Sequence, residues 1–437
     1  MSPGHGHDPA VAPDQHRPPT AIQKTDTMKR YLACFPILLL LFAATLASCV
    51  KEGSSDPTRP GRTVLAYFGG DNNLSAETHA KIEAIRRGWR SGNGRLLIYC
   101  DAAGQDPHLL RLRGGCNANP TPYLETVARY PEENSASADV FARVIADVKR
   151  SDPADSYGLL VFSHASGWLP AGTLRNPAGP ATAAPAPSAG SPADAAQRPG
   201  TASIVIDDTP GRQEMELADF AAAIPDRAFD FIIFETCLTA GIEVAYALRN
   251  KTDYVLASAA EIVSPGFTPV YASAITELFA TAATTERNLT GFASAWFDYI
   301  TATGGWGTMS LVRTGGLDTL AGLVRKALAA PGGRPDPATL QHFDRPGSYG
   351  DRPAIARFFD LGEYLEQVAP ASSQRAIADQ LARTVVWKEA TATFLPGVNG
   401  FTIRRHSGLT TYIEQEAFPY LNGCYRSTAW YLATAQQ

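Results

Sequence analysis

Residues 231–241 read Phe-Ile-Ile-Phe-Glu-Thr-Cys-Leu-Thr-Ala-Gly. The apolar run 231–234 is uniform rather than alternating, which predicts a strand buried on both faces of a parallel sheet. Residues 239–248 are expected to form a helix, so Cys237 falls in the turn between the two elements. Ligands and catalytic groups gather at the carboxyl ends of strands in open α/β sheets. We therefore expect a thiol whose pKa is lowered by the start of the following helix.

The alternative for Cys237 is a small buried side chain that only fills space. A cysteine inside the apolar run would suit that reading better. Cys237 instead lies beyond the run, after Glu235 and Thr236. This position favours a nucleophile.

A second unit of the same kind precedes the first. Residues 157–161 predict an apolar strand, and residues 162–168 read Phe-Ser-His-Ala-Ser-Gly-Trp. A nucleophilic thiol needs a base, and His164 lies in this turn. If the two strands are neighbours, His164 and Cys237 meet at one edge of the sheet. The alternative is a surface or hydrogen-bonded histidine.

These two turns and their flanks resemble the clostripain-like cysteine peptidases, a family of caspase-like fold. The family's histidine block reads roughly His-Gly-x-Gly-Trp, and its cysteine block reads Asp-Ala-Cys. The resemblance covers most of the chain from Thr63 onward, apart from one insert. Further similar stretches are Val64-Leu65-Ala66-Tyr67, Asp71-Asn72-Asn73-Leu74, Glu243-Val244-Ala245-Tyr246, Thr252-Asp253-Tyr254-Val255-Leu256-Ala257-Ser258, Glu261-Ile262, Phe359-Asp360-Leu361-Gly362 and Gly408-Leu409-Thr410-Thr411-Tyr412-Ile413.

The resemblance implies a peptidase in which the Cys237 thiolate attacks a peptide carbonyl and His164 carries the proton. The backbone N–H groups of Cys237 and Ala165 would hold the oxyanion. The family has glycine where this chain has Ala165, and Ser163 also departs from the pattern. Alanine keeps the N–H donor but would be strained at a positive φ.

The resemblance also implies cleavage after Arg or Lys, with a carboxylate two residues before the cysteine in the substrate pocket. That residue is Glu235 here, where the family has Asp. The alternative is a carboxylate that faces the start of the next helix. Trp168 is a candidate wall of the cleft or a core residue, and Ser258 is a candidate cleft residue in the loop 257–267.

An insert separates the two turns. Residues 176–200 are mostly Ala, Pro, Gly and Ser, which bury too little apolar surface to order the chain. The resemblance implies self-cleavage after a basic residue in this region. Arg175 and Arg198 flank the insert and are the candidate processing sites. An inert surface loop is the alternative.

The N-terminal segment, 1–49, has the pattern of an extension followed by an export signal. Residues 1–27 are polar, and Met28 is a better start because two basic residues and the apolar run 31–47 follow it. Residues 46–49, Leu-Ala-Ser-Cys, resemble a bacterial lipobox. We therefore expect acylation of Cys49, a tether over 50–61, and anchoring in the bacterial cell envelope, periplasmic or at the cell surface. A transmembrane anchor is the alternative.

Composition limits the other readings. The 437 residues are 45% hydrophobic and 19% charged, as in globular proteins, and the net charge of −5 gives no support for nucleic-acid binding. Six cysteines are too few for a disulfide scaffold, and a bond between Cys100 and Cys116 stays open.

Strands alternating with helices predict an α/β fold, a three-layer αβα sheet that is mostly parallel, over 62–314. The caspase-like assignment comes from the resemblance, as does a smaller, mainly helical C-terminal region over 315–437. His108–Arg113 is expected as an edge strand, and helices are expected over 373–387 and 425–433.

No cofactor is required for the expected chemistry, although calcium is a further association of the family. Oxygen-bearing loop residues are present, but none forms the spaced acidic loop of a calcium site, so no metal ligands are assigned. They are Asp71, Asn72, Asn73, Asp101, Asp207 and Asp208. A serine or metal hydrolase lacks any supporting motif. A non-catalytic lipoprotein that uses the same fold for binding is the remaining alternative.

Overall fold

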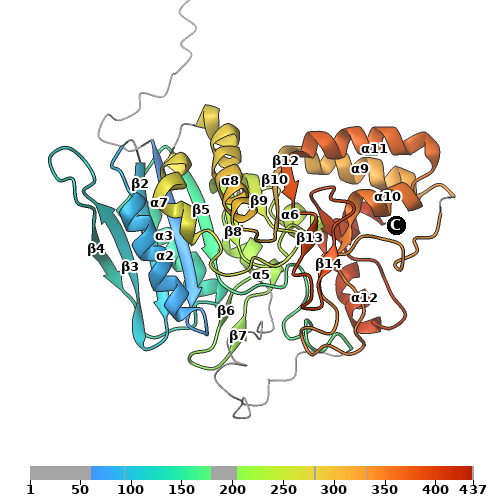
Figure 1. Cartoon of the computed structure of the whole chain (residues 1–437), viewed down its shortest axis with the longest axis horizontal. Helices are drawn as coiled ribbons and strands as arrows, with labels where there is room; N and C mark the ends of the chain where they lie inside the picture. Colours follow the sequence, from blue (N-terminus) through green and yellow to red (C-terminus); the bar gives the residue numbers. More distant parts are fainter. Residues whose placement is uncertain (1–60, 93, 179–203, 280–281, 332, 436–437) are drawn as a thin grey trace, which may run out of the picture. The chain divides into compact units, whose positions relative to one another are not determined.

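The computed structural model describes residues 61–92, 94–178, 204–279, 282–331 and 333–435. They belong to one compact unit, whose centre is a nine-stranded sheet. Figure 1 shows this sheet running from β4 to β12. In order across the sheet the strands are β12 (Val385–Ala390), β10 (Thr308–Arg313), β9 (Thr252–Ala257), β8 (Phe229–Glu235), β5 (Ser156–Phe162), β1 (Arg62–Gly70), β2 (Gly94–Ala102), β3 (Gln105–Arg113) and β4 (Tyr123–Arg129).

The middle of the sheet is parallel and its two margins are antiparallel. Strands β9, β8, β5, β1 and β2 run in one direction. Strands β10 and β12 at one margin, and β3 and β4 at the other, pair antiparallel. The central strands are apolar along their length because helices cover both of their faces.

Helices form a layer on each face of the sheet, so the predicted three-layer α/β fold is confirmed. Alternate residues of β1 enter two separate cores, with Leu65 and Tyr67 in one and Val64 and Phe68 in the other. The first core is covered by α3 (Ala138–Ser151), α5 (Leu217–Ala223), α6 (Ile242–Ala247) and α9 (Leu317–Leu328). The second is covered by α2 (Ser75–Gly88), α7 (Thr268–Ala274), η1 (Ile275–Phe279) and α8 (Thr285–Ala302).

The C-terminal part packs against the first core and also enters the sheet. Its helices are α10 (Leu361–Val368), α11 (Ala371–Thr384), α12 (Pro419–Arg426) and α13 (Ala429–Thr434). The helix expected over 373–387 ends at Thr384, and the next residues form β12 against β10. Val385, Val386 and Trp387 are β-branched or aromatic, and pairing along β10 suits them better than a helix.

Two further expectations differ from the structure. The helix expected over 425–433 is two short helices, α12 and α13, with a break at Ser427 and Thr428. Strand β3 lies inside the sheet rather than at its edge, because β4 pairs with its outer side. Cys100 and Cys116 are both free thiols.

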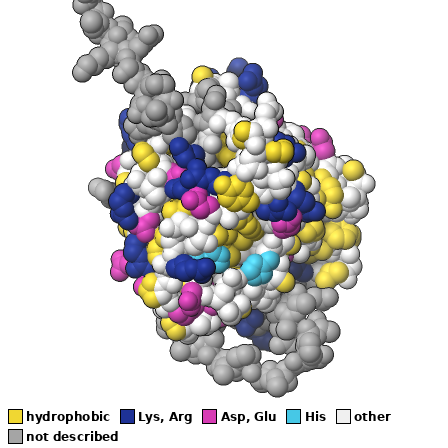
Figure 2. Space-filling model, turned by 90° about the vertical axis from the view of Figure 1, so that its left-hand side faces the viewer, with side chains coloured by type: hydrophobic (Ala, Val, Ile, Leu, Met, Phe, Trp, Pro, Cys, Tyr) yellow, Lys and Arg dark blue, Asp and Glu magenta, His cyan; other side chains and the backbone are white. Residues whose placement is uncertain are grey.

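Some expectations concern residues outside the described ranges. Cys49, the tether and Arg198 lie there, as does the insert from residue 179 onward. Within the described residues, no helix combines the length and apolar character needed to cross a membrane. The face in Figure 2 mixes basic, acidic and apolar side chains. The ion pairs at the surface include Arg86–Glu83 on α2 and Arg113–Glu125 between β3 and β4.

The pairing of β5 with β8 leaves no room beside Gly158. A Cβ atom built there would lie 2.1 Å from the ring of Phe231. We expect Gly158→Ala to lower the free energy of unfolding by about 1–3 kcal/mol, because the ring or the strand must shift.

Gly322→Ala is the matched control, since Gly322 lies inside α9 with nothing within 4 Å of its added Cβ. That change should be neutral or stabilising by up to about 1 kcal/mol. Denaturant unfolding of the two variants measures both effects. Equal stabilities would contradict the tight packing of β5 on β8.

Candidate active site

The register of two central strands sets the position of the candidate site. Strands β5 and β8 are parallel neighbours, and Phe162 is paired with Glu235. His164 and Cys237 each lie two residues beyond this pair. Neighbouring strands are about 4.8 Å apart, so the two turns leave the sheet side by side at the same edge. The expected convergence of the histidine and cysteine turns is therefore present in the backbone.

The two turns also touch each other directly. Gly167 has a φ of 63°, and a Cβ atom built on it would lie 2.3 Å from the carbonyl oxygen of Leu238. Only glycine tolerates both this conformation and this approach. Ser163 locks the histidine turn, because its hydroxyl donates to Gly69 O (2.7 Å) and accepts from Ile206 N (3.1 Å).

The cysteine turn is held against the segment that follows β9. Leu238 N donates to Ala260 O at 3.0 Å, and Ala240 N donates to Ser258 O at 2.9 Å. Leu238 has a φ of 60°, an uncommon value for a side chain of this size. Such local strain persists only where the surroundings fix the backbone, and it often marks a functional turn.

The environment of the thiol differs from the expected one. Helix α6 begins at Ile242 rather than at Thr239, so Cys237 does not lie at a helix start. Burial raises the pKa of the half-buried Cys237 to about 12, and the carboxylate of Glu261 raises it further. The backbone of Ile262 and the charge of Arg345 act in the opposite direction. The expectation of a lowered thiol pKa is wrong for this state of the chain.

His164 is held by a residue from a third segment. Its Nε2 lies 2.6 Å from the side-chain oxygen of Asn73, in the turn after β1. An amide oxygen can only accept, so Nε2 carries the proton and Nδ1 of the neutral ring stays available as a base. Burial lowers the pKa of His164 to about 4, and the positive charge of Arg212 adds to this effect.

Glu235 is built into the fold rather than presented to a substrate. The residue is 2% exposed, and one of its oxygens accepts from Lys81 Nζ at 2.6 Å and from Phe267 N at 2.5 Å. The other oxygen accepts from the Tyr271 hydroxyl. The expected role of Glu235 in a substrate pocket is therefore contradicted, because Lys81 already neutralises this carboxylate.

Lys81 also contacts a second carboxylate. Its Nζ lies 2.9 Å from Glu77, whose side chain is 18% exposed. Two carboxylates thus share one ammonium group, and one negative charge is left over. The charge of Glu77 acts on both Cys237 and His164, since it raises the pKa of each. Glu77 is the more accessible acid of this pair.

The other candidate residues have structural surroundings. Trp168 is 4% exposed and its ring packs on Tyr412 and Tyr425, so it belongs to the core rather than to a cleft wall. Ser258 is fully buried, with its hydroxyl 2.9 Å from that of Thr308. Ala165 does not have a positive φ, so the backbone strain expected for alanine in that conformation is absent. Arg175 is exposed.

Acidic groups cluster beside the turn that carries Asn73. One carboxylate oxygen each from Asp71, Asp101 and Glu132 lie within 4.8 Å of one another. Asp101 is fully buried, and neither of its oxygens has a hydrogen-bond partner among the described residues. Asp207 is also fully buried, and its carboxylate accepts from Thr209 N and from both the N–H and hydroxyl of Ser135.

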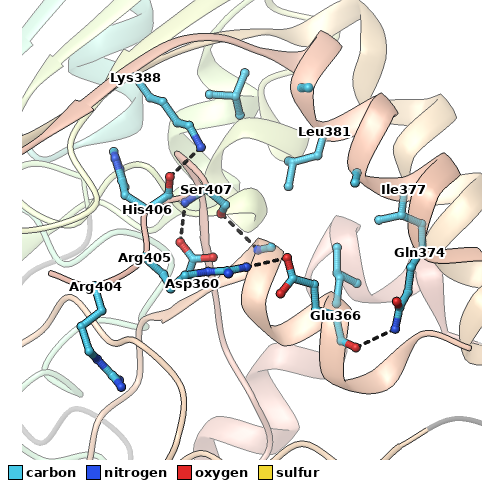
Figure 3. Close-up of a pocket in the computed structure, with 15 residues that line it drawn as sticks. Asp360, Glu366, Gln374, Ile377, Leu381, Lys388, Arg404, Arg405, His406 and Ser407 are labelled. Atoms are coloured by element: carbon cyan, nitrogen blue, oxygen red, sulfur yellow. Dashed lines mark hydrogen bonds and ion pairs between the residues drawn. The ribbon is translucent and has the colours of Figure 1, made fainter. Parts of the chain in front are cut away.

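The chain also has a cavity away from these residues. It has a volume of about 470 Å³ and lies between α10, α11, β12 and residues 404–407. Figure 3 shows apolar side chains such as Leu381 on one wall and Lys388 and Arg405 on another. Its lining contains none of the predicted site residues.

Sequence reasoning did not assign several residues that the structure brings to the site. The sequence places Asn73 in a family-like stretch and among the oxygen-bearing loop residues but does not pair it with His164, and it gives no role to Lys81, Glu77 or Arg345. Asn73 and His164 are 91 positions apart, so no local spacing predicts their contact. From sequence alone, a lysine on a helix such as Lys81 is expected to face solvent. Its burial follows only from its pairing with Glu235.

The low pKa of His164 generates a prediction. Replacing Arg212 by Gln removes a positive charge that disfavours the imidazolium, so the pKa should rise from about 4 toward 6.5. Arg212 also neutralises Asp208, whose freed charge would raise the pKa further. Titration of the imidazole by NMR, assigned with His164→Gln, measures the shift. A wild-type pKa near 6.5 would contradict the buried environment.

Comparisons with known proteins agree with this geometry. Residues 189–314 match the model of the clostripain family, Peptidase_C11. No curated protein is similar enough in sequence to match.

Two solved structures resemble the chain over most of its length. An inactive zymogen C11 protease from Parabacteroides distasonis is 28% identical, with a TM-score of 0.71 over 87% of this chain and 99% of that one. A secreted C11 cysteine protease from Bacteroides thetaiotaomicron, solved with an irreversible peptide inhibitor, is 24% identical. It covers 86% of this chain and 99% of that one with a TM-score of 0.68, a likeness of fold. The sheet has this topology, and its cysteine and histidine turns lie side by side. Together with these similarities, this indicates a cysteine peptidase that resembles the clostripain family.

Proposed function

We propose that the chain is an endopeptidase in which Cys237 attacks the peptide carbonyl, His164 transfers the proton, and the bond after an Arg or Lys residue is cleaved. The observation that supports this most is the register of β5 and β8, which brings the two turns together. The contact of Gly167 with Leu238 fixes them at close range. The peptide inhibitor bound by the Bacteroides protease is consistent with a peptide substrate here.

The resting pair is neutral in this proposal. Burial holds the pKa of Cys237 near 12 and that of His164 near 4, which disfavours a preformed thiolate–imidazolium pair. The thiol proton therefore passes to Nδ1 of His164 as the sulfur–carbon bond forms. The imidazolium then protonates the leaving amine as the peptide C–N bond breaks. Water hydrolyses the thioester, with His164 again accepting a proton.

Backbone donors would stabilise the oxyanion of the tetrahedral intermediate. The N–H of Leu238 is already bonded to Ala260 O, so it is not the donor. The proposed donors are the N–H groups of Cys237 and Ala165, which come from the two converging turns. Because Ala165 adopts no positive φ, alanine does not impair this role.

The preference for a basic side chain is supported by the charge balance beside the site. Lys81 is shared by Glu77 and Glu235, which leaves a net negative charge at the carboxyl edge of the sheet. A cationic substrate side chain would compensate that charge, whereas an acidic one would add to it. Glu77 is the more accessible member of the pair, since its side chain is 18% exposed and Glu235 is buried.

The proposal predicts activity on fluorogenic peptides that end in Arg or Lys. Cys237→Ala and His164→Ala should each reduce kcat/KM by at least about a thousand-fold, because each removes a group that acts in bond making. Asn73→Ala should cause a smaller loss, since it frees the imidazole without removing it. Equal hydrolysis by wild type and both dyad variants would reject the proposal and favour a non-catalytic binding protein.

We further propose that the chain is processed in its insert and anchored through its N-terminal segment. Arg175 is exposed at the described end of the insert, and Arg198 lies beyond the described residues. Cleavage after either residue would separate the histidine turn from the cysteine turn in the chain but not in the fold. Acylation at Cys49 would hold the mature protein on a membrane of the cell envelope, and one acyl chain alone would be insufficient.

Mass spectrometry of protein extracted from membranes tests both parts of this proposal. Wild type should give one fragment that ends at Arg175 or Arg198 and a second that begins at the following residue, and Cys237→Ala should stay intact. The N-terminal fragment should begin at Cys49 with the mass of its acyl chains, and Cys49→Ser should lose them. An uncut, unacylated wild-type chain would contradict both.

The acidic cluster also fits a divalent cation such as Ca²⁺, and we propose Asp71, Asp101 and Glu132 as its ligands. Calcium prefers carboxylate oxygens, and three such oxygens converge here. Both oxygens of the buried Asp101 lack hydrogen-bond partners, and no ion pair described for the structure involves these three residues. Burial and the nearby Asp207 raise the pKa of Asp101 to about 9, as expected of a carboxylate without a compensating cation. A bound cation would supply that compensation and fix the turn that holds Asn73 against His164.

Calorimetry and thermal unfolding with added Ca²⁺ test this site. We expect binding to wild type and a rise in Tm, since a ligand that binds only the folded chain stabilises it. Asp101→Asn should abolish both effects, because it removes a carboxylate oxygen from the ligand set. The exposed Asp139→Asn is the control. A wild-type protein that neither binds Ca²⁺ nor shifts its Tm would contradict the proposal.

A further inference from the structure

A second carboxylate lies beside the thiol. The segment 260–262 runs along the cysteine turn, since Leu238 N donates to Ala260 O at 3.0 Å and the backbone of Ile262 bonds to Cys237. Glu261 lies between these two contacts and is 6% exposed. Its Oε1 accepts no hydrogen bond from the described residues. Apart from its arginine partner, the hydroxyl of the buried Tyr349 bonds to this carboxylate, so Glu261 is held by fewer donors than Glu235.

The partner of Glu261 is an arginine from the C-terminal part of the chain. Arg345 Nε donates to Glu261 Oε2 at 2.7 Å, and the two side chains are 11% and 7% exposed. Arg345 also donates from Nη1 to Val398 O at 3.0 Å. The two residues are 84 positions apart, so the ion pair joins the C-terminal part to the edge of the cysteine turn.

The loop that carries Arg345 is fixed at its base and exposed at its tip. At the base, the buried Arg357 donates to Asp351 at 2.9 Å and, through its backbone, to Asp344 at 3.0 Å. Beyond Arg345, Asn399 donates to Pro346 O at 2.7 Å from an exposed loop. The backbone of Arg345 is held as well, since its N–H donates to the hydroxyl of the buried Tyr349 at 3.1 Å. The Arg345 side chain is therefore the part that can leave Glu261 while the loop stays in place.

We propose that Glu261 binds the basic side chain of the substrate, and that Arg345 occupies this carboxylate when no substrate is present. The inference rests on the proposed preference for Arg or Lys. A guanidinium seated on a carboxylate next to the nucleophile has the chemistry of a bound basic side chain. Exchanging one such cation for another keeps the buried carboxylate paired, whereas removing Arg345 without replacement leaves it uncompensated.

The exchange also accounts for two other observations. Glu235 cannot supply the site, because Lys81 and two further donors already occupy its oxygens. In the resting chain Glu261 raises the pKa of Cys237 and Arg345 lowers it. The cationic side chain of a bound substrate would lower this pKa in place of Arg345. A substrate without a basic side chain could not replace Arg345 on Glu261, so the Arg345–Glu261 ion pair disfavours its binding.

Binding of benzamidine, a small amidinium, tests the proposal without catalysis. The measurements use calorimetry on the Cys237→Ala chain. Arg345→Gln should bind benzamidine at least about tenfold more tightly than its parent, since it vacates the carboxylate. Glu261→Gln should abolish binding. Asn399→Ala, which loosens the loop without removing a charge, should tighten binding to a smaller degree. Arg405→Gln, in the surface pair with Glu366, is the control and should change nothing.

Kinetics on peptides ending in Arg provide the second readout. Arg345→Gln should lower KM with kcat little changed, and Glu261→Gln should raise KM for Arg peptides but not for Gln peptides. Loss of kcat/KM by the same factor for all peptides in both variants would overturn the inference. Benzamidine binding of equal affinity in the Glu261→Gln variant and its parent would also overturn the inference. If the benzamidine pattern holds while no peptide is cut, the proposed peptidase function fails and the binding site stands.

Discussion

The parallel pairing of β5 with β8 is the constraint on which the rest of the site depends. It sets Phe162 opposite Glu235, so the two turns that follow these residues leave the same edge of the sheet side by side. Close packing then removes the remaining freedom, since Gly167 and Gly158 each face an atom where any side chain would clash. A slip of one residue in this register would turn His164 and Cys237 to opposite faces. The chemistry is thus assembled by backbone hydrogen bonds before any side chain contributes.

Charge compensation divides the acidic residues around this edge into different roles. Glu235 is paired by a lysine and closed in by the loop that contains Gly266, so it stabilises the fold. Glu261 is paired by an arginine that reaches in from the C-terminal part, so its partner can change. Asp101 has no hydrogen-bond partner among the described residues, which is why we propose a bound cation beside it. The groups within hydrogen-bond reach therefore decide whether a carboxylate stabilises the fold, as Glu235 does, or suits the proposed roles of Glu261 in substrate binding and of Asp101 in metal binding.

Burial gives the nucleophile and base a neutral resting state. The raised pKa of Cys237 and the lowered pKa of His164 have the same first cause, which is loss of water around a group that would carry charge. Such a thiol is protected from adventitious oxidation and alkylation until a substrate changes its surroundings. The C-terminal part acts against this state through Arg345, whose charge lowers the pKa of Cys237, although it carries none of the proposed catalytic groups.

The sequence by itself determined the α/β class, most strand and helix positions, and the two turns that hold the candidate dyad. These follow from uniform apolar runs and helical periodicity, which are local properties of the chain. It also indicated the family, through an ordered set of short motifs. It could not determine that Glu235 is neutralised, that Trp168 and Ser258 are core residues, or that residues 385–390 form a strand. Those outcomes depend on partners such as Lys81, Tyr412 and β10, which lie far away in the chain. The tertiary structure alone decided which carboxylates are compensated, because the free energy of a buried charge depends on its neighbours in space.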